Sequence, residues 1–343
     1  MQQTVSSPAQ PLLRVENLQT HLYLRRGVLK AVDNVSLAVA SGETLGLVGE
    51  SGCGKTMTCL SILRLLPRQS GRIVDGHVWL DGVDLAHLPE REMARHWRGR
   101  RVAMVTQDPM TSLNPVFTVG DQVGAPLRAH SLASGARAVR DAAVEVLRHV
   151  RIPSAETRFD DYPHQFSGGM RQRVVSAMAI ACQPRLLVLD EPTSNLDVTI
   201  QVQMIELFRE LQNESGLGII LVTHDLGVAA AICHRVAVMY AGRIVEAGDV
   251  RAIYRRAAHP YTRALLESIP HLGVRRERLA SIAGQPPSLI DPPAGCRFAP
   301  RCAHRTEKCN HIYPPETRLA PQHSVACWHP LRDPLRNPSG EQA

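Results

Sequence analysis

The segment from residue 49 to residue 56 has the residue types and spacing of a phosphate-binding loop, G-x-x-x-x-G-K-[ST]. Its three glycines allow a tight backbone turn, so that consecutive N–H groups converge on phosphate oxygens at a helix N-terminus. Lys55 would bring an ammonium charge toward the β- and γ-phosphates, and the hydroxyl of Thr56 would bind Mg²⁺. The sequence therefore predicts that a nucleoside triphosphate binds at Gly49, Glu50, Ser51, Gly52, Cys53, Gly54, Lys55 and Thr56.

Polar side chains follow two other apolar runs, each typical of a buried strand. Residues 102–105 lead to Gln107, whose amide can reach a metal ion or a water beside the γ-phosphate. Residues 186–189 lead to Asp190 and Glu191, at the edge where open α/β sheets bind their ligands. We expect Asp190 to bind Mg²⁺ and Glu191 to orient or deprotonate the attacking water. The predicted magnesium ligands are Thr56, Gln107 and Asp190.

Two ring side chains are further candidates for the nucleotide site. His224 follows the apolar run 219–222, and its imidazole can hydrogen-bond a γ-phosphate or the attacking water. Tyr23 is the last aromatic residue before the phosphate loop and could stack on an adenine ring. An ordinary strand position is the alternative interpretation of Tyr23.

The run Ser167-Gly168-Gly169-Met170 predicts a second anion site. Ser167 is a good helix N-cap, and the two glycines would leave the helix N-terminus open to a phosphate. One nucleotide needs a single phosphate cradle. The second cradle therefore indicates that two chains share each nucleotide.

The periodicity of apolar residues predicts the elements that position these side chains. Strands are expected at residues 12–24, 35–39, 44–48, 102–105, 186–189 and 219–222, with a hairpin over 235–245. Residues 57–66 predict a helix that ends before Pro67, and residues 108–162 predict a helical insertion. The chain is therefore expected to be an α/β protein.

Composition and charge limit the class of protein. The chain has 343 residues, of which 44% are hydrophobic and 21% charged, as in ordinary soluble domains. No apolar run approaches the ~20 residues of a membrane helix. Residues 1–11 lack the basic and apolar regions of a secretory signal, so we expect a cytoplasmic protein.

The net charge of +7 lies in residues 251–343, which carry 14 Lys/Arg and 7 Asp/Glu. This shift in composition predicts a domain boundary near residue 250. The basic tail has few aromatic residues among its basic ones, so nucleic acid is not an expected partner.

Taken together, these residues resemble an ATP-binding cassette (ABC) protein over nearly all of residues 12–250. The matching residues are the phosphate loop 49–56, Gln107, Ser167-Gly168-Gly169-Met170, Asp190-Glu191, Asp197 and His224. The family usually has Gln at the position of Met170. Residues 107–115, 166–173 and 259–266 further resemble the dipeptide/oligopeptide importer branch.

The resemblance implies an ABC-type nucleotide-binding domain over residues 12–250. Such a domain has a RecA-like mixed sheet core, an antiparallel β subdomain and a helical subdomain, here at about residues 108–165. A small Cys-rich C-terminal domain is expected over residues 251–343.

The resemblance also implies the mode of action. Two cassettes would pair head to tail, so that Ser167, Gly168, Gly169 and Met170 of one chain contact ATP on the other, with Asp197 in a loop at the dimer contact. Glu191 and His224 would be catalytic. The implied partners are a paralogous ATPase subunit (a heterodimer favoured over a homodimer), two transmembrane permease subunits and a periplasmic or extracellular solute-binding protein.

The expected function is ATP hydrolysis coupled to import of di- and oligopeptides, at the cytoplasmic face of the inner membrane. Nickel or another small solute is the alternative cargo. A soluble ABC ATPase outside transport is a second alternative, although only 60 residues separate Gln107 from Ser167, too few for the long coiled coil of repair ATPases.

Four of the eight cysteines, Cys296, Cys302, Cys309 and Cys327, lie in the proline-rich tail. Such a segment has little hydrophobic core and needs a cross-link for stability. In a reducing compartment a metal centre is favoured over disulfides. No C-x₂₋₄-C knuckle is present, so the spacing favours an Fe–S cluster, with zinc or no metal as alternatives. Similar importer subunits carry such a cysteine set, which implies a [4Fe–4S] cluster bound by Cys296, Cys302, Cys309 and Cys327. Nearby histidines leave a mixed-ligand site open: His304, His311, His323 and His329.

Overall fold

The computed structural model describes residues 10–194, 196–269 and 282–332. The chain forms two compact units. The first unit contains Leu37–Glu43, His77–Ile220 and the residues up to Val15; the second contains Glu16–Ser36, Thr44–Gly76 and the residues from Leu221 onward. Residues 1–9 of the predicted N-terminal segment lie outside the described residues, as do 270–281 and 333–343 of the predicted C-terminal domain.

The second unit contains a mixed sheet with the strand order β11-β12-β10-β9-β3. β3 (Thr44–Val48) and β9 (Arg235–Tyr240) are parallel, with Val48 opposite Val238. β9 pairs antiparallel with β10 (Arg243–Asp249), which confirms the predicted hairpin. β10 pairs antiparallel with β12 (His323–Val325), and β12 with β11 (Thr317–Ala320). Two strands of the tail therefore belong to the sheet that contains β3.

The position of β11 and β12 in this sheet is relevant to the Cys-rich C-terminal domain expected over residues 251–343. The described tail residues belong to the same compact unit as the phosphate loop, and the division into units does not fall at residue 250. A separate Cys-rich C-terminal domain is not confirmed. The boundary at residue 250 stays a prediction from composition.

The helices of the second unit are short. They are α1 (Lys55–Ile62), α9 (Leu226–Ile232), α10 (Val250–Arg256), α11 (Pro260–Glu267), α12 (Glu307–His311) and the 3₁₀ turn η3 (Ala299–Arg301). The predicted helix over residues 57–66 ends earlier, at Ile62. Arg64 has a left-handed backbone with φ 52°, and this conformation terminates the helix before Pro67.

A smaller sheet has the strand order β2-β1-β4-β5. Its strands are β1 (Leu13–Leu24), β2 (Gly27–Val39), β4 (Gly71–Leu80) and β5 (Val83–Asp84). β4 and β5 are antiparallel and are joined by Asp81-Gly82, which both have positive φ, as a type I′ hairpin turn requires. β2 begins eight residues before the predicted strand 35–39, at the glycine that ends the Arg25-Arg26 turn.

In the first unit, β6 (Val102–Val105) and β7 (Leu186–Asp190) are parallel, with Val105 opposite Leu189. β8 (Gly218–Thr223) is entirely buried, like β7. The strands predicted at 102–105, 186–189 and 219–222 are thus confirmed to within one residue at each end. Parallel pairing of β6 and β7 places their carboxyl ends side by side.

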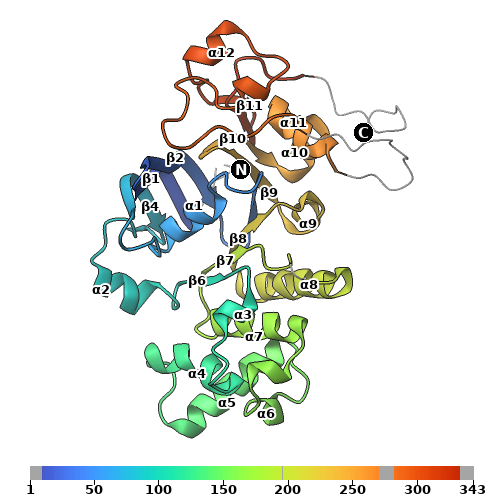
Figure 1. The fold of residues 1–343 in the computed structure, drawn as a ribbon. Coiled ribbons are helices and arrows are strands. Elements are labelled where there is room, and N and C mark those ends of the chain that lie inside the picture. Colours follow the sequence, from blue (N-terminus) through green and yellow to red (C-terminus); the bar gives the residue numbers. More distant parts are fainter. Residues whose placement is uncertain (1–9, 195, 270–281, 333–343) are drawn as a thin grey trace, which may run out of the picture. The chain divides into compact units, whose positions relative to one another are not determined.

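Most helices of the first unit follow β6 or β7 in the chain, and two short helical segments precede β6. They are α2 (Glu90–Glu92), α3 (Pro109–Ser112), α4 (Val119–Ala129), α5 (Ala136–His149), α6 (Ala155–Arg158), α7 (Gly168–Ile180) and α8 (Val198–Ser215), with the π-helical segment η1 (Met93–Trp97) and the 3₁₀ turn η2 (Pro163–Gln165). Figure 1 shows α4 to α7 gathered in one group. Residues 108–165 thus hold helices, as the helical insertion predicts. Among the described residues, no helix has both the length and the apolar character that crossing a bilayer requires.

Candidate functional site

The phosphate loop connects the buried strand β3 to helix α1. Gly49 and Gly54 have φ values of 151° and 110°, which only glycine adopts readily. A Cβ atom would lie 2.2 Å from the Met239 carbonyl oxygen at Gly49, and 2.4 Å from that of Ala31 at Gly54. Glycine at these two positions is therefore required by backbone conformation and by close packing. Ser51, Gly52 and Thr56 are exposed, so this face of the loop is open to a ligand.

Lys55, the first residue of α1, lies over the loop. Its Nζ donates hydrogen bonds to the carbonyl oxygens of Gly49 (2.8 Å) and Glu50 (3.0 Å). The Cys53 Sγ lies 3.8 Å from the same Nζ. Burial raises the pKa of the Cys53 thiol, although the neighbouring Lys55 opposes this effect. The thiol is therefore protonated at neutral pH, in keeping with its packed position beneath the loop.

The tail fixes the second residue of the loop, Glu50. The Glu50 N–H donates to the Tyr261 hydroxyl over 2.9 Å. The Arg301 guanidinium donates to both carboxylate oxygens of Glu50, over 2.8 and 3.0 Å. The Arg301 side chain is only 4% exposed, and its hydrogen bonds to Glu50 raise its pKa further. This bidentate pair connects the phosphate loop to the segment that carries Cys302.

An aromatic cluster supports these contacts. Tyr240 and Tyr261 have ring centroids 4.5 Å apart, and each lies within 5.4 Å of the Phe298 ring. Arg301 also donates to the Tyr240 hydroxyl (3.2 Å). Aromatic pairs at these distances contribute beyond their buried area, so the tail holds Arg301 in one position.

In the first unit, the parallel strands β6 and β7 bring Gln107 and Glu191 together. The Gln107 Nε2 donates to the Glu191 Oε2 over 3.2 Å. Asp190, the last residue of β7, is buried (6% exposed). Glu191 has a left-handed backbone conformation with φ 47°. This conformation is strained for a residue with a side chain, and residues strained in this way occur most often at functional sites. The predicted trio of amide and carboxylates is therefore assembled at one sheet edge.

The Ser167-Gly168-Gly169-Met170 run starts α7 as expected. The Ser167 Oγ accepts a hydrogen bond from the Met170 N–H (3.3 Å), which makes Ser167 the N-cap. Ser167 and Gly168 are exposed, and a Cβ on Gly168 would meet no atom within 4 Å. A Cβ on Gly169 would lie 2.7 Å from Ile200 of α8. The two glycines thus differ: the first leaves the helix end open, and the second allows close packing on α8.

The remaining predicted residues are exposed. Asp197 caps α8, because its Oδ1 accepts from the Ile200 N–H (3.0 Å). His224 follows β8 and precedes Asp225, the N-cap of α9. Tyr23 is 51% exposed near the end of β1, as a stacking platform requires. Their roles in binding or catalysis stay predictions.

The four tail cysteines line one cavity of about 10 Å³, which has room for one water or one ion. All four are free thiols. The Cys296 N–H donates to the Cys309 carbonyl oxygen over 2.8 Å, so these two residues are adjacent. Burial raises the pKa values of Cys296 and Cys302, and raises that of Cys327 to about 12. Cys296, Cys302 and Cys327 would therefore be held ionised only by a strong positive charge, such as a metal centre.

His259 lines the same cavity and was not among the histidines named from the sequence. Its Nδ1 accepts from the Tyr261 N–H (3.0 Å), so the neutral ring carries its proton on Nε2. Complete burial lowers the pKa of His259 to about 4, despite the nearby Glu246. The Nε2–H is buried and has no hydrogen-bond partner among the described residues.

Three residues of this arrangement, His259, Tyr261 and Arg301, were therefore missed as site residues. His259 and Tyr261 belong to the His-Pro-Tyr-Thr-Arg run. The resemblance of this run to the dipeptide/oligopeptide importer branch was the one signal in the sequence that could have identified them. Arg301 carries no local signal, since its partner Glu50 is 251 positions away.

Comparison with known proteins gives matches over most of the chain. A family model described as ABC transporter matches residues 32–194, and one described as the C-terminal region of oligopeptide/dipeptide transporters matches residues 245–309. A probable peptide ABC transporter ATP-binding protein of Sinorhizobium fredii, y4tR, is 50% identical over 318 residues, which cover 92% of this chain and 94% of that protein.

Two dipeptide transport ATP-binding proteins, both named DppD, are similarly close. The protein of Bacillus subtilis is 47% identical, covering 92% of this chain and 94% of its own; that of Escherichia coli is 44% identical, covering 94% and 98%. Among solved structures, a dimeric post-hydrolysis state of the ATP-binding cassette MJ0796, bound to ADP and Pi, has a TM-score of 0.62 at 26% identity. The match covers 70% of this chain and 99% of the MJ0796 chain.

Proposed function

Because this chain belongs to the ABC transporter family as an ATP-binding protein, we propose that it hydrolyses ATP to drive the import of di- and oligopeptides. One observation carries this proposal more than any other. Relatives named as ATP-binding proteins of peptide or dipeptide transport match more than nine-tenths of the chain, including the tail that lies beyond the cassette. We further propose that residues 12–250 act as the cassette and residues 251–343 as an accessory C-terminal region.

The proposed ATP site uses the residues described above. The loop amides and Lys55 would bind the phosphates, and Tyr23 would stack on the adenine. Thr56, Gln107 and Asp190 offer the oxygen ligands that Mg²⁺ prefers. Bound Mg²⁺ would neutralise charge on the β- and γ-phosphates.

Glu191 is the proposed general base for the attacking water. Its hydrogen bond from Gln107 holds the carboxylate at the end of β7, and the strained backbone fixes its direction. His224 would contact the γ-phosphate or the same water. Lys55 would then stabilise the charge that develops as the γ-phosphoryl group leaves.

We propose that two cassettes pair head to tail. The exposed N-terminus of α7, with Ser167 and Gly168 uncovered, is suited to the phosphates of ATP bound to another chain. The ATP-binding cassette MJ0796 is dimeric in a solved structure, which supports the pairing of two cassettes by analogy. Asp197 would lie at the dimer contact, and a paralogous subunit is favoured over a second copy of this chain.

The pair would act with two transmembrane permease subunits and an external solute-binding protein, at the cytoplasmic face of the inner membrane. The helices within residues 108–165 would contact the permeases. The proposal that peptides are the cargo rests on relatives whose names include peptide or dipeptide transport.

We also propose that Cys296, Cys302, Cys309 and Cys327 bind a [4Fe–4S] cluster, with zinc as the alternative. The donor set fits, because four thiols share one cavity. The Nε2–H of His259, which has no hydrogen-bond partner among the described residues, would suit a cluster sulfur at that cavity. The cavity of about 10 Å³ holds a single ion without rearrangement, whereas a four-iron cluster requires the thiols to move apart.

The experiment that tests the function is Glu191→Gln in the purified transporter complex. Loss of the general base should reduce ATP turnover by about 100-fold or more while ATP binding is retained. The variant should also accumulate as an ATP-bound cassette dimer in size-exclusion chromatography. Appreciable hydrolysis by the Glu191→Gln complex would contradict the role of Glu191, and ATP turnover that peptide and binding protein never stimulate would contradict peptide import.

A further inference from the structure

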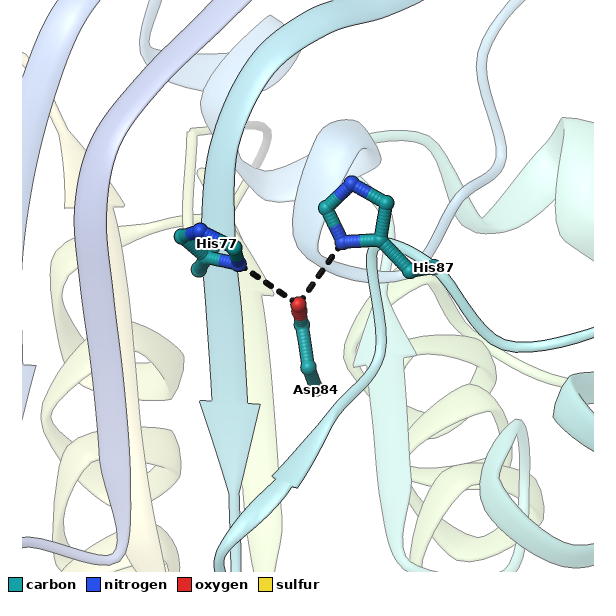
Figure 2. Close-up of side chains that lie close together, drawn as sticks. All are labelled: His77, Asp84 and His87. Carbon is teal, nitrogen blue, oxygen red and sulfur yellow. Dashed lines mark hydrogen bonds and ion pairs between the residues drawn. The ribbon is translucent and has the colours of Figure 1, made fainter.

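His77, Asp84 and His87 form a cluster on the β4–β5 hairpin, outside the proposed ATP site (Figure 2). The tight turn at Asp81-Gly82 pairs Trp79 with Asp84. Because alternate residues of a strand face the same side, His77 lies on the same face as Trp79 and Asp84. His87 follows β5 and returns to this face from the other direction.

The three side chains converge on one carboxylate oxygen. The Nδ1 atoms of His77 and His87 each lie 2.7 Å from the Asp84 Oδ2. Figure 2 marks both contacts with dashed lines. The other carboxylate oxygen, Oδ1, accepts from the N–H groups of Val78 (3.0 Å) and Ala86 (3.1 Å). The backbone therefore holds Asp84 in place, with Oδ2 directed at both imidazoles.

Charge and exposure also suit a cation at this point. Burial alone would raise the pKa of Asp84, but hydrogen bonds from His77, His87 and the two amides outweigh it and lower the pKa, so the carboxylate is ionised at neutral pH. The His77 and His87 side chains are 50% and 64% exposed, whereas Asp84 is 15% exposed. The two rings are tilted by 48°, with centroids 5.2 Å apart, so they are not stacked face to face.

We propose that His77, Asp84 and His87 bind a divalent transition-metal ion, with zinc as the expected ion. One ligand atom from each residue lies within 4.8 Å of the other two. Ligands at about 2.0–2.1 Å around a tetrahedral zinc ion are roughly 3.4 Å apart. The Nδ1–Oδ2 distances must therefore lengthen by roughly 0.7 Å, which rotation of the two exposed imidazoles provides while Asp84 stays fixed.

The donor set selects the class of ion. Two imidazole nitrogens and one carboxylate oxygen are typical ligands of Zn²⁺, Co²⁺, Ni²⁺ and Cu²⁺, whereas Mg²⁺ and Ca²⁺ prefer oxygen ligands alone. Binding of the ion through Nδ1 requires each imidazole to carry its proton on Nε2. Solvent or a partner would complete the coordination, since both histidines are exposed.

The test is titration of the metal-free full-length chain with Co²⁺, followed by visible absorption. Co²⁺ bound by nitrogen and oxygen shows d–d bands without the near-ultraviolet thiolate charge transfer that the tail cysteines would give. The wild-type chain should bind one Co²⁺ of this kind. The double variant His77→Gln/His87→Gln should lose it, and Asp84→Asn should weaken Co²⁺ and Zn²⁺ binding at least tenfold.

The matched control is His96→Gln, which removes an exposed histidine on η1 and should change nothing. The single variant His87→Gln provides a second test if the double variant does not fold, because His87 lies beyond the end of β5. Equal stoichiometry and affinity for Co²⁺ in the wild type and the His77/His87 variants would overturn the proposal. Co²⁺ spectra that show only thiolate-bound metal would do the same.

Discussion

Replacing Arg301 with glutamine is expected to weaken ATP binding, although Arg301 lies 251 positions from the phosphate loop in the sequence. The guanidinium makes two hydrogen bonds to the Glu50 carboxylate and neutralises its charge. Without Arg301, the second residue of the loop would carry an uncompensated negative charge close to the ATP phosphates. The loop would also lose its main contact with the tail.

The burial of the Arg301–Glu50 pair and the charge of Glu50 determine the expected losses of stability and of ATP affinity. Removing one partner of a buried ion pair costs about 3–5 kcal/mol. The Glu50 side chain is 25% exposed, so water can replace part of the lost contact, and we expect the free energy of unfolding to fall by about 2 kcal/mol. A unit charge about 10 Å from a phosphate charge repels it by roughly 1–2 kcal/mol at an effective dielectric constant near 20. ATP affinity should therefore decrease about tenfold.

The assay is the equilibrium binding of a fluorescent ATP analogue, with thermal unfolding measured on the same samples. Arg301→Lys should recover part of the affinity, since it keeps the charge and loses the bidentate geometry. Arg318→Gln is the matched control, because Arg318 is an exposed tail residue that bonds only to backbone of its own hairpin among the contacts described. It should leave both measurements unchanged.

A double variant separates charge from packing. In Glu50→Gln/Arg301→Gln the unpaired carboxylate is absent, so ATP affinity should return to within about threefold of the wild type, while stability stays reduced. Equal ATP affinity in Arg301→Gln and wild type would refute the reasoning. If the double variant binds ATP as weakly as Arg301→Gln alone, the electrostatic explanation is wrong.

Two further predictions concern the cysteine cavity. Protein purified without oxygen should be brown and contain about four iron and four sulfide per chain, measured by elemental and sulfide analysis; a colourless sample with stoichiometric zinc would contradict the cluster. His259→Phe should retain the iron but shift the reduction potential of the cluster, because the Nε2–H donor is lost, and an unchanged potential in redox titration would show that this N–H does not bond the cluster.

Local patterns predicted several of the structural elements that carry the proposed ATP site. The strand at Thr44–Val48 and the helix N-cap at Ser167 were both identified, because each depends on residues close together in sequence. Helix ends were predicted less well. α1 ends at Ile62 because Arg64 adopts a left-handed backbone, and apolar periodicity carries no signal for that conformation.

The same local patterns did not predict contacts between segments that are far apart in the sequence. The pairing of β12 with β10 joins the tail to the sheet that contains β3, whereas the proline-rich composition suggested a separate domain. The His259 Nε2–H has no hydrogen-bond partner within the part of the chain that the structure describes, and its burial also depends on tertiary packing, since the surrounding residues exclude water from the ring.

The sequence by itself thus determined that this chain binds ATP and which residues form its phosphate loop, because spacing of a few residues fixes a loop between a strand and a helix. Only the tertiary structure decided that Tyr261 and Arg301 hold that loop, and that Gln107 meets Glu191. The physical reason is that hydrogen bonds across 84 to 251 residues exist only after the strands have paired.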